Sequence, residues 1–450
     1  MLLTGEKDIL VNLYIFNNGG SSRLLDSLSE LLMDIRYQFL NDNNCKSVPR
    51  LLAVLQKTLL TLCGAWPYET NTWRCFILRV IFVVGTIFFF SLPQLFCQQW
   101  LNFRENMKSL DTMMACLPFF VSSFIATWKG YLLYYNSNGL KILLEDLKRD
   151  WEYCSHVEAE SNIIKKYAKL GKLITIIYAG SIQMVLTLYY ISCCVSPVLD
   201  IILPLNESRS RYFILQGDLY VHTEDYFFFI LTMEWYGIVV AAYYTCAFDS
   251  LYITFMLHIC GVFAVLSQKL ETLKVNNIKR KKYNLSQGSL APDEIIYRQL
   301  SECIKLHLRC IKYVDQLNST LSAAFFPDLF LGVLLAGASA YMFVTSMNDL
   351  DQQIRNGMLY TCQTLRIFVT SVPGQLLIDH SSYVYTATCN NQWYDFPKKS
   401  KQLLLIFMMG SMKPTEFIVA KIFTINRDLF TKISRACLSY CTVMLSVQNR

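Results

Sequence analysis

Hydrophobic and polar residues alternate in long blocks along the chain, and the apolar blocks have the length of membrane-spanning helices. A hydrocarbon layer about 30 Å thick requires roughly 20 apolar residues in a helix. The runs of about this length are residues 76–97, 112–135, 173–196, 226–262, 321–346, 358–382 and, more weakly, 427–447. The fourth run is longer than a bilayer requires, so we expect it to tilt or to project beyond the membrane. The pattern predicts an all-α membrane protein with seven transmembrane helices.

Two segments between these runs are amphipathic. From Leu140 to Leu170 and from Pro292 to Leu317, Leu and Ile recur every three or four residues with charged residues between them. Each segment is predicted to form a helix. Two interpretations stay open, namely helices on the membrane surface or a packed cytoplasmic layer that extends the spans.

The last apolar region is interrupted. The stretch "CNNQWYDFPKKSK" is predicted to be a short turn, and "QLLLIFMMG" is a half-helix too short to cross a bilayer. In the following "SMKPTEF", we expect Pro414 to lie in the first turn of another helix. The chain then divides into a cytoplasmic N-terminal region (1–75), six spans with helical extensions and a ligand pocket in their outer half (76–382), and a split seventh helix (383–450).

The distribution of Lys and Arg predicts the orientation in the membrane, because short loops rich in them stay in the cytoplasm. The segment before the first run has seven, the loop after the second has eight and the loop after the fourth has ten, whereas the alternate loops have two, two and one. The N-terminus is therefore expected inside and the C-terminus outside. Asn206 begins a glycosylation sequon in a loop expected outside, although sequons at Asn284 and Asn318 match equally well inside. The basic segment "IKRKKYNLSQGSLAP" is expected to lie near anionic membrane lipid.

Composition and motifs exclude several classes of protein. With 53% hydrophobic and 17% charged residues, the chain has more apolar side chains than a soluble core would bury. The inverted orientation and the absence of Asp-Arg-Tyr and Asn-Pro-x-x-Tyr motifs argue against a G-protein-coupled receptor. The five histidines share no metal-ligand spacing, and no phosphate-binding or nucleophile motif is present, so we expect no enzyme, metal, cofactor or nucleic-acid partner. A transporter remains an alternative, although internal repeats are missing.

Three motifs together resemble those of insect odorant receptors. The segment "LLTLCGAWPYE" before the first run is similar to a Gly-x-Trp-Pro motif of that family, and Asp249, His258, Leu266 and Leu270 have the spacing of its fourth span. The C-terminal signature comprises Ala387, Asn390, Trp393, Tyr394, Pro397, Lys399, Leu404, Pro414, Ala420, Phe423, Phe430, Ser439 and Tyr440. The resemblance covers the whole chain in length and expected topology.

Some positions depart from the family pattern. Cys389 stands where many members have Tyr, and Lys421 where many have Gly. The related gustatory receptors carry Gln six residues after a Thr-Tyr motif, whereas Ser446 stands at that distance from Tyr440. This difference favours a tuning odorant receptor subunit over a homomeric gustatory-type receptor, which stays an alternative, and over the shared co-receptor.

The resemblance implies a ligand-gated, non-selective cation channel in the plasma membrane of a sensory neuron. This subunit would form a heterotetramer with the co-receptor, bind a small volatile odorant between spans two and six, and line the pore with its last helix. The gate would involve Cys437, Tyr440 and Cys441. The alternatives for the two cysteines are packing between helices or, less favoured, metal binding.

A pocket for a small volatile needs aromatic and Met walls with one or two polar groups. The expected positions in the outer halves of the spans are Phe119, Phe120, Ser123, Gln183, Met184, Thr187, Met233, Tyr236 and Tyr341. Ionisable groups inside spans are costly and therefore informative. Glu234 and Arg366 appear at similar depth, and we expect them to pair, with separate extension of each side chain toward the interface as the alternative.

Overall fold

The computed structural model describes residues 110–203, 226–273, 292–346 and 349–448, and a few single positions between 57 and 80. All of them belong to one of two compact units of the chain, Leu51–Arg450. The predicted run 76–97 lies almost entirely outside the described residues. Asn206 and the basic segment 278–291 also lie outside them.

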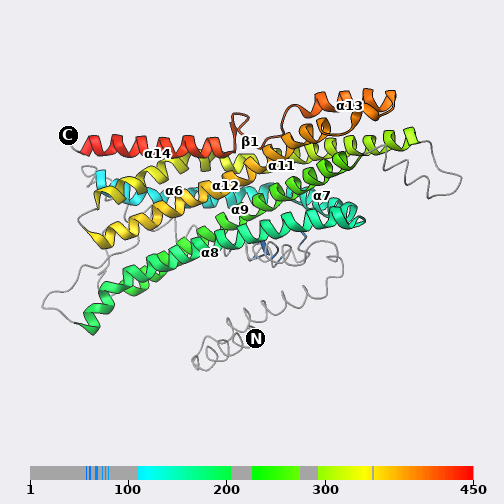
Figure 1. Ribbon diagram of the computed structural model, residues 1–450. Helices are drawn as coiled ribbons and strands as arrows, with labels where there is room; N and C mark the ends of the chain where they lie inside the picture. Colours follow the sequence, from blue (N-terminus) through cyan, green and yellow to red (C-terminus); the bar gives the residue numbers. More distant parts are fainter. Residues whose placement is uncertain are drawn as a thin grey trace. The chain divides into compact units, whose positions relative to one another are not determined.

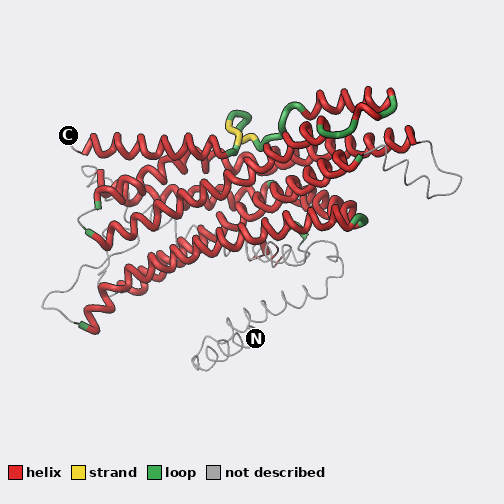
Figure 2. The backbone as a smooth tube through the Cα atoms, in the orientation of Figure 1, coloured by secondary structure: helices red, strands yellow, loops and turns green. Residues whose placement is uncertain are grey.

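The six remaining predicted runs are all helical. They lie within α6 (Leu110–Tyr135), α8 (Glu158–Ile202), α9 (Phe227–Thr272), α11 (Pro292–Thr345), α12 (Leu350–Cys389) and α14 (Arg427–Gln448). These helices run side by side in a bundle (Figure 1). Figure 2 shows that helix accounts for nearly all of the described chain. The helical prediction is confirmed for these six runs.

Helix α11 joins a predicted amphipathic segment to a predicted span without a break. Its 54 residues extend about 80 Å at 1.5 Å per residue, more than twice the thickness of a hydrocarbon layer. The first turns of α8 continue into its apolar part in the same way. This continuity favours a packed extension of the bundle over separate helices on a membrane surface.

The prediction of one helix from Leu140 to Leu170 is wrong. Helix α7 (Ser137–Ser155) ends before His156, Val157 adopts extended backbone angles (φ −118°, ψ 121°), and α8 begins at Glu158. The two helices pack against each other. The break contains neither Gly nor Pro, and the spacing of apolar residues continues across it. The sequence pattern therefore gives no sign of the break. The acidic Glu158 and Glu160 favour a helix start because they complement the positive end of the helix dipole.

Helix α9 is the centre of the bundle and contacts α6, α7, α8, α11 and α12. In its most apolar 18-residue stretch 94% of the residues are buried, against 11% for α8. A helix that is apolar all round is one that is surrounded. The length of the fourth apolar run therefore reflects burial within protein, whereas the apolar surface of α8 faces outward.

Among the described residues, three helices are long and apolar enough to cross a membrane: Glu158–Ile202, Phe227–Thr272 and Asp293–Thr345. The helices that contain the predicted spans 112–135, 358–382 and 427–447 do not meet this criterion. Polar residues lower their hydropathy, and some of these, such as Lys129 of α6 and Arg366 of α12, are buried inside the bundle.

The C-terminal region breaks into shorter elements after α12. A 3₁₀ turn, η4 (Trp393–Asp395), leads into α13 (Lys398–Ser411), and a two-stranded antiparallel hairpin, β1 (Ile418–Val419) with β2 (Phe423–Thr424), precedes α14 (Figure 2). Lys421 in the hairpin turn has a φ of 59°, in the left-handed region that favours Gly.

The expected helix start at Pro414 is wrong, because this segment leads into the hairpin. Phe417 and Val419 are fully buried, and Asn318 of α11 fixes the strand by accepting from the Ile418 N–H (3.0 Å) and donating to the Glu416 carbonyl (3.3 Å). The next helix begins only at Arg427. Its start is capped by Asn426, whose side chain accepts from the Leu429 N–H at 2.8 Å.

Candidate functional site

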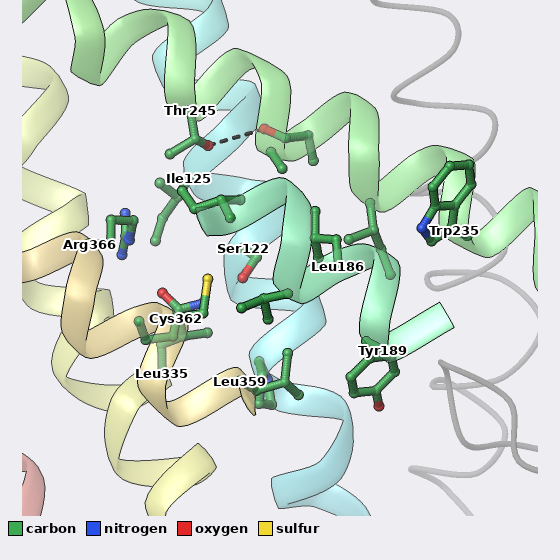
Figure 3. Close-up of a pocket in the computed structure, with 17 residues that line it drawn as sticks. Ser122, Ile125, Leu186, Tyr189, Trp235, Thr245, Leu335, Leu359, Cys362 and Arg366 are labelled. Atoms are coloured by element: carbon green, nitrogen blue, oxygen red, sulfur yellow. Dashed lines mark hydrogen bonds between the residues drawn. The ribbon is translucent and has the colours of Figure 1, made fainter. Parts of the chain in front are cut away.

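A cavity of about 110 Å³ lies among α6, α8, α9, α11 and α12. Most of its wall is aliphatic or aromatic, and all five helices contribute side chains to it (Figure 3). The lining residues are Pro118, Ser122, Ile125, Ile182, Val185, Leu186, Tyr189, Trp235, Ile238, Ala241, Ala242, Thr245, Leu335, Leu359, Cys362, Gln363 and Arg366. A largely apolar site with few polar groups suits a small organic molecule.

The predicted ligand-binding residues lie on helices that form the cavity, but the described side chains among them do not line it. Of the candidates whose side chains are described, namely Ser123, Gln183, Met184, Thr187, Met233, Tyr236 and Tyr341, none lines this cavity. The side chains of Phe119 and Phe120 lie outside the described part.

Five of these candidates have an immediate neighbour that lines the cavity, and these neighbours are Ser122, Ile182, Val185, Leu186 and Trp235. Adjacent residues of a helix point about 100° apart, so an error of one position turns a side chain out of the site. Met184 and Tyr236 are about half exposed.

A cluster of four buried charges lies at one end of the cavity. The Lys129 Nζ of α6 lies 2.7 Å from Asp249 Oδ1 of α9 and 2.8 Å from Asp328 Oδ2 of α11. Arg366 of α12 contacts Asp328 through Nη1, and the Tyr178 hydroxyl of α8 donates to Asp249 Oδ2 at 2.7 Å. These residues, which we name the ion-pair cluster, join five helices.

The composition of the ion-pair cluster explains how it is tolerated. Two cations balance two carboxylates, and each charge has a hydrogen-bonded partner of opposite sign. Burial of charge is costly without such pairing. The rings of Phe248 and Phe325 each have their centroid 5.5 Å from Lys129 Nζ and add a favourable cation–π environment.

The expected pair of Glu234 and Arg366 is wrong in its partner. Helix α12 begins at Leu350, eight residues before the predicted run, so Arg366 lies 16 residues, or about 24 Å, along its helix. Glu234 lies only seven residues, or about 10 Å, from the start of α9 at Phe227. Both helices start at the same end of the bundle, and Arg366 reaches the depth of Asp328 instead.

Lys129 and Asp328 are not among the predicted site residues, and Lys129 is counted with the loop residues in the predicted charge distribution. Both lie inside predicted apolar runs, which is the signal that would have found them, because ionisable residues rarely occur there without a role. Removing Lys129 from its loop leaves seven cations there, so the predicted charge bias is unchanged.

A second polar network lies toward the ends of α7, α8, α9 and α11. Asp150 of α7 contacts His258 at 3.3 Å and Arg309 at 2.8 Å, and Lys269 contacts Glu160 at 3.0 Å. Nearby, the His307 ring lies between Phe263 and Phe407, and burial there lowers the pKa of His307. This network holds the extended ends of the helices together.

The face of α14 that carries Cys437 and Cys441 packs within the chain. Cys437 is 3% exposed and contacts Ala336 and Ile433, and Cys441 is 6% exposed and packs with Tyr341 of α11. Gly337 of α11 leaves room for the Tyr440 ring. The structure therefore supports the alternative in which the two cysteines pack between helices. No group of three His, Cys, Asp or Glu side chains in the described part is arranged to hold a metal ion.

A mostly helical bundle with apolar helices long enough to cross a membrane suits a multi-pass membrane protein. A sequence profile described as 7tm Odorant receptor matches residues 109–438. The chain belongs to this odorant receptor family, and it is a receptor rather than an enzyme.

Relatives in several insects support this assignment. Putative odorant receptor 92a of Drosophila melanogaster is 20% identical over 377 residues, 81% of this chain and 86% of that protein. Odorant receptor Or2 of Anopheles gambiae is 26% identical over 204 residues, 45% of this chain and 52% of that protein. The odorant receptor coreceptor of Anopheles gambiae is 26% identical over 149 residues, 32% of this chain and 31% of its own length. The chain thus matches about half or less of the last two.

The fold is that of a solved insect olfactory receptor. The structure of OR5 from Machilis hrabei in complex with eugenol matches with a TM-score of 0.67 at 13% identity, covering 88% of this chain and 98% of that one.

Proposed function

We propose that the chain is a tuning odorant receptor subunit of a ligand-gated, non-selective cation channel in the plasma membrane of a sensory neuron. A small volatile molecule binds in the cavity among α6, α8, α9, α11 and α12. The observation that carries this proposal is the largely apolar cavity within a member of the odorant receptor family. The similar fold of an olfactory receptor solved in complex with eugenol supports it.

The surface of α8 supports placement in a membrane. Its apolar stretch is 11% buried and presents Ile177, Leu188, Ile191 and Val195 to the outside. Exposed apolar area on this scale is unfavourable in water and favourable in lipid. We place the N-terminus in the cytoplasm and the C-terminus outside, with the ends of α7, α8, α9 and α11 and the whole of α13 as a packed cytoplasmic layer.

The partner we propose is the odorant receptor co-receptor, in a heterotetramer. Similarity to co-receptors of Anopheles gambiae and Aedes aegypti supports compatible packing surfaces, because related subunits form related interfaces. The last helix of each subunit would line a shared pore.

The test is whole-cell current from cells expressing this chain with and without a co-receptor, with G-protein signalling blocked and a panel of volatiles applied. We expect a fast cation current that requires both chains. A current that persists with this chain alone would contradict the heteromeric channel. A response that disappears when G-protein signalling is blocked would contradict direct gating.

A further inference from the structure

We propose that the cytoplasmic end of α8 binds the headgroups of anionic phospholipids in the inner leaflet of the membrane. The binding residues are four lysines, which we name the α8 lysine cluster: Lys165, Lys166, Lys169 and Lys172. This inference rests on the proposed function, because it uses the membrane placement proposed above. It follows from the position of the cluster on its helix, from its depth and from its unbalanced charge.

The α8 lysine cluster directly precedes the outward apolar surface of α8, a helix on the outside of the bundle (Figure 1). Three of its lysines are exposed, and Lys172 is half-buried. Lys166 and the exposed Leu173 are seven residues apart, as are Lys169 and the exposed Ile176. Seven residues are close to two helical turns, so the two side chains of each pair point in nearly the same direction. The basic surface and the apolar surface are therefore continuous.

The depth of the cluster matches one headgroup layer of a bilayer. Residues 173–199 contain no Asp, Glu, Lys or Arg, and the next charged residue is Asp200. At 1.5 Å per residue, the rise along α8 from Lys172 to Asp200 is about 42 Å. A bilayer with its headgroup regions is about 40–45 Å thick. In the proposed orientation, α8 thus brings the lysines to the inner headgroups while its apolar surface faces the acyl chains.

The charge of the α8 lysine cluster is not neutralised within the chain. Throughout the described ranges, none of its four lysines has an ion-pair or hydrogen-bond partner. The carboxylates of adjoining elements have other partners. Glu160 contacts Lys269 at 3.0 Å, and Asp379 of α12 accepts from Gln375 at 2.8 Å. Each lysine near an anionic lipid surface contributes about fivefold in affinity. Because the cluster continues a surface that faces lipid, a phospholipid is favoured over an acidic protein partner.

Native mass spectrometry tests the preference directly, because it resolves individual lipids bound to the purified full-length chain. The chain in detergent is titrated with phosphatidylserine or with phosphatidylcholine of the same acyl chains. The second lipid has no net charge and is the matched control. We expect phosphatidylserine to bind about tenfold more tightly. Raising the ionic strength to about 1 M, where charges are screened within about 3 Å, should remove most of this difference.

Variants of the chain then assign the preference to the cluster. The preference should disappear in the quadruple variant Lys165→Gln, Lys166→Gln, Lys169→Gln and Lys172→Gln. Arg at the same four positions keeps the charge and should keep the preference. The control variant loses the same number of charges in and just after α13, through Lys398→Gln, Lys399→Gln, Lys401→Gln and Lys413→Gln. It should bind like the unaltered chain.

Three results would overturn the inference: equal binding of the two lipids by the unaltered chain, an undiminished preference after Gln replaces the cluster, or the same loss in the α13 control. If the unaltered chain does not discriminate between the lipids and the Gln variant fails to assemble with the co-receptor, the cluster is a protein interface instead. A lipid preference that follows the cluster without any odorant-evoked current would refute the proposed channel and leave the lipid site intact. An odorant-evoked current without a lipid preference would do the reverse.

Discussion

A lysine ammonium without exposed surface is stable only where carboxylates replace its water. Lys129 is 0% exposed and has two carboxylate partners, Asp249 and Asp328, on two other helices. Because Asp328 also contacts Arg366, the four charges form a chain that ends in the cavity wall. A change at any one charge therefore affects the others, and charge balance, more than any single contact, should determine stability at this site.

A double-mutant cycle of Lys129 and Asp249 tests whether charge balance determines the stability of the ion-pair cluster. Lys129→Met leaves two carboxylates with one cation, and we expect it to destabilise the protein by about 3 kcal/mol. Adding Asp249→Asn restores neutrality, so the double variant should recover most of this loss. The measurement is the melting temperature of each detergent-purified variant.

An exposed pair provides the control for the cycle. Lys432 Nζ lies 3.6 Å from Asp428 on α14, and both side chains are more than 70% exposed. Lys432→Met should change stability by less than about 1 kcal/mol. If Lys129→Met and Asp249→Asn simply add, with no recovery in the double variant, charge balance is not what holds the cluster together.

At the scale of elements, the junction between α12 and the C-terminal hairpin depends on a close backbone approach. Gly374 of α12 lies against the carbonyl of Ile425, and a Cβ at Gly374 would overlap that oxygen. Ser381 lies two turns further along α12. Its hydroxyl donates to the Thr415 carbonyl and accepts from the Thr415 N–H. The hairpin and the start of α14 are thus positioned by contacts with one face of α12.

We therefore expect Gly374→Ala to be strongly disruptive. The obstructing atom belongs to the backbone and cannot rotate away, so the substitution should cost about 3 kcal/mol and reduce the amount of folded protein at the cell surface. Gly180→Ala in α8 is the matched control, because nothing lies within 4 Å of the added methyl group. The helix propensity of Ala should make Gly180→Ala neutral or slightly stabilising. Equal surface expression of both variants would contradict the tight junction.

The sequence predicts elements better than it predicts their faces and breaks. Apolar run length correctly predicted helix for the six described runs, since an apolar block of about 20 residues is a strong signal. It missed the break at Val157, which carries no Gly or Pro, and it missed the hairpin after Met412, where Pro414 fits a helix start as well as a turn; both features depend on tertiary packing. Most of the described pocket candidates lie one position away from a residue that lines the cavity, a difference that the hydrophobic pattern does not resolve in helices that are apolar on several sides.

At the scale of the whole molecule, the outward face of α14 has a polar centre. Its exposed residues include Ser439, Thr442 and Ser446, which follow one another at helical spacing, while Leu438 borders the stripe they form. The opposite face, with Cys437 and Cys441, packs against α11. A polar stripe on a spanning helix is unfavourable against lipid and favourable against water. In the proposed tetramer, this stripe is the surface that suits the pore.

Cysteine accessibility distinguishes the stripe from the buried cysteines. In cells that co-express the co-receptor, Ser439→Cys and Thr442→Cys should each allow a positively charged methanethiosulfonate reagent to block most of the odorant-evoked current. The bulky cation attached to a pore-facing side chain both fills the path and repels permeant cations. The unaltered chain should be insensitive to the reagent, because Cys437 and Cys441 are buried. The double variant Cys437→Ser with Cys441→Ser should be equally insensitive.

If instead the unaltered channel is blocked and the block requires Cys437 or Cys441, those thiols face the pore in the open assembly. The helix would then have to rotate about its axis by roughly 150° relative to its packing against α11, because that is the angle between the two faces at 100° per residue.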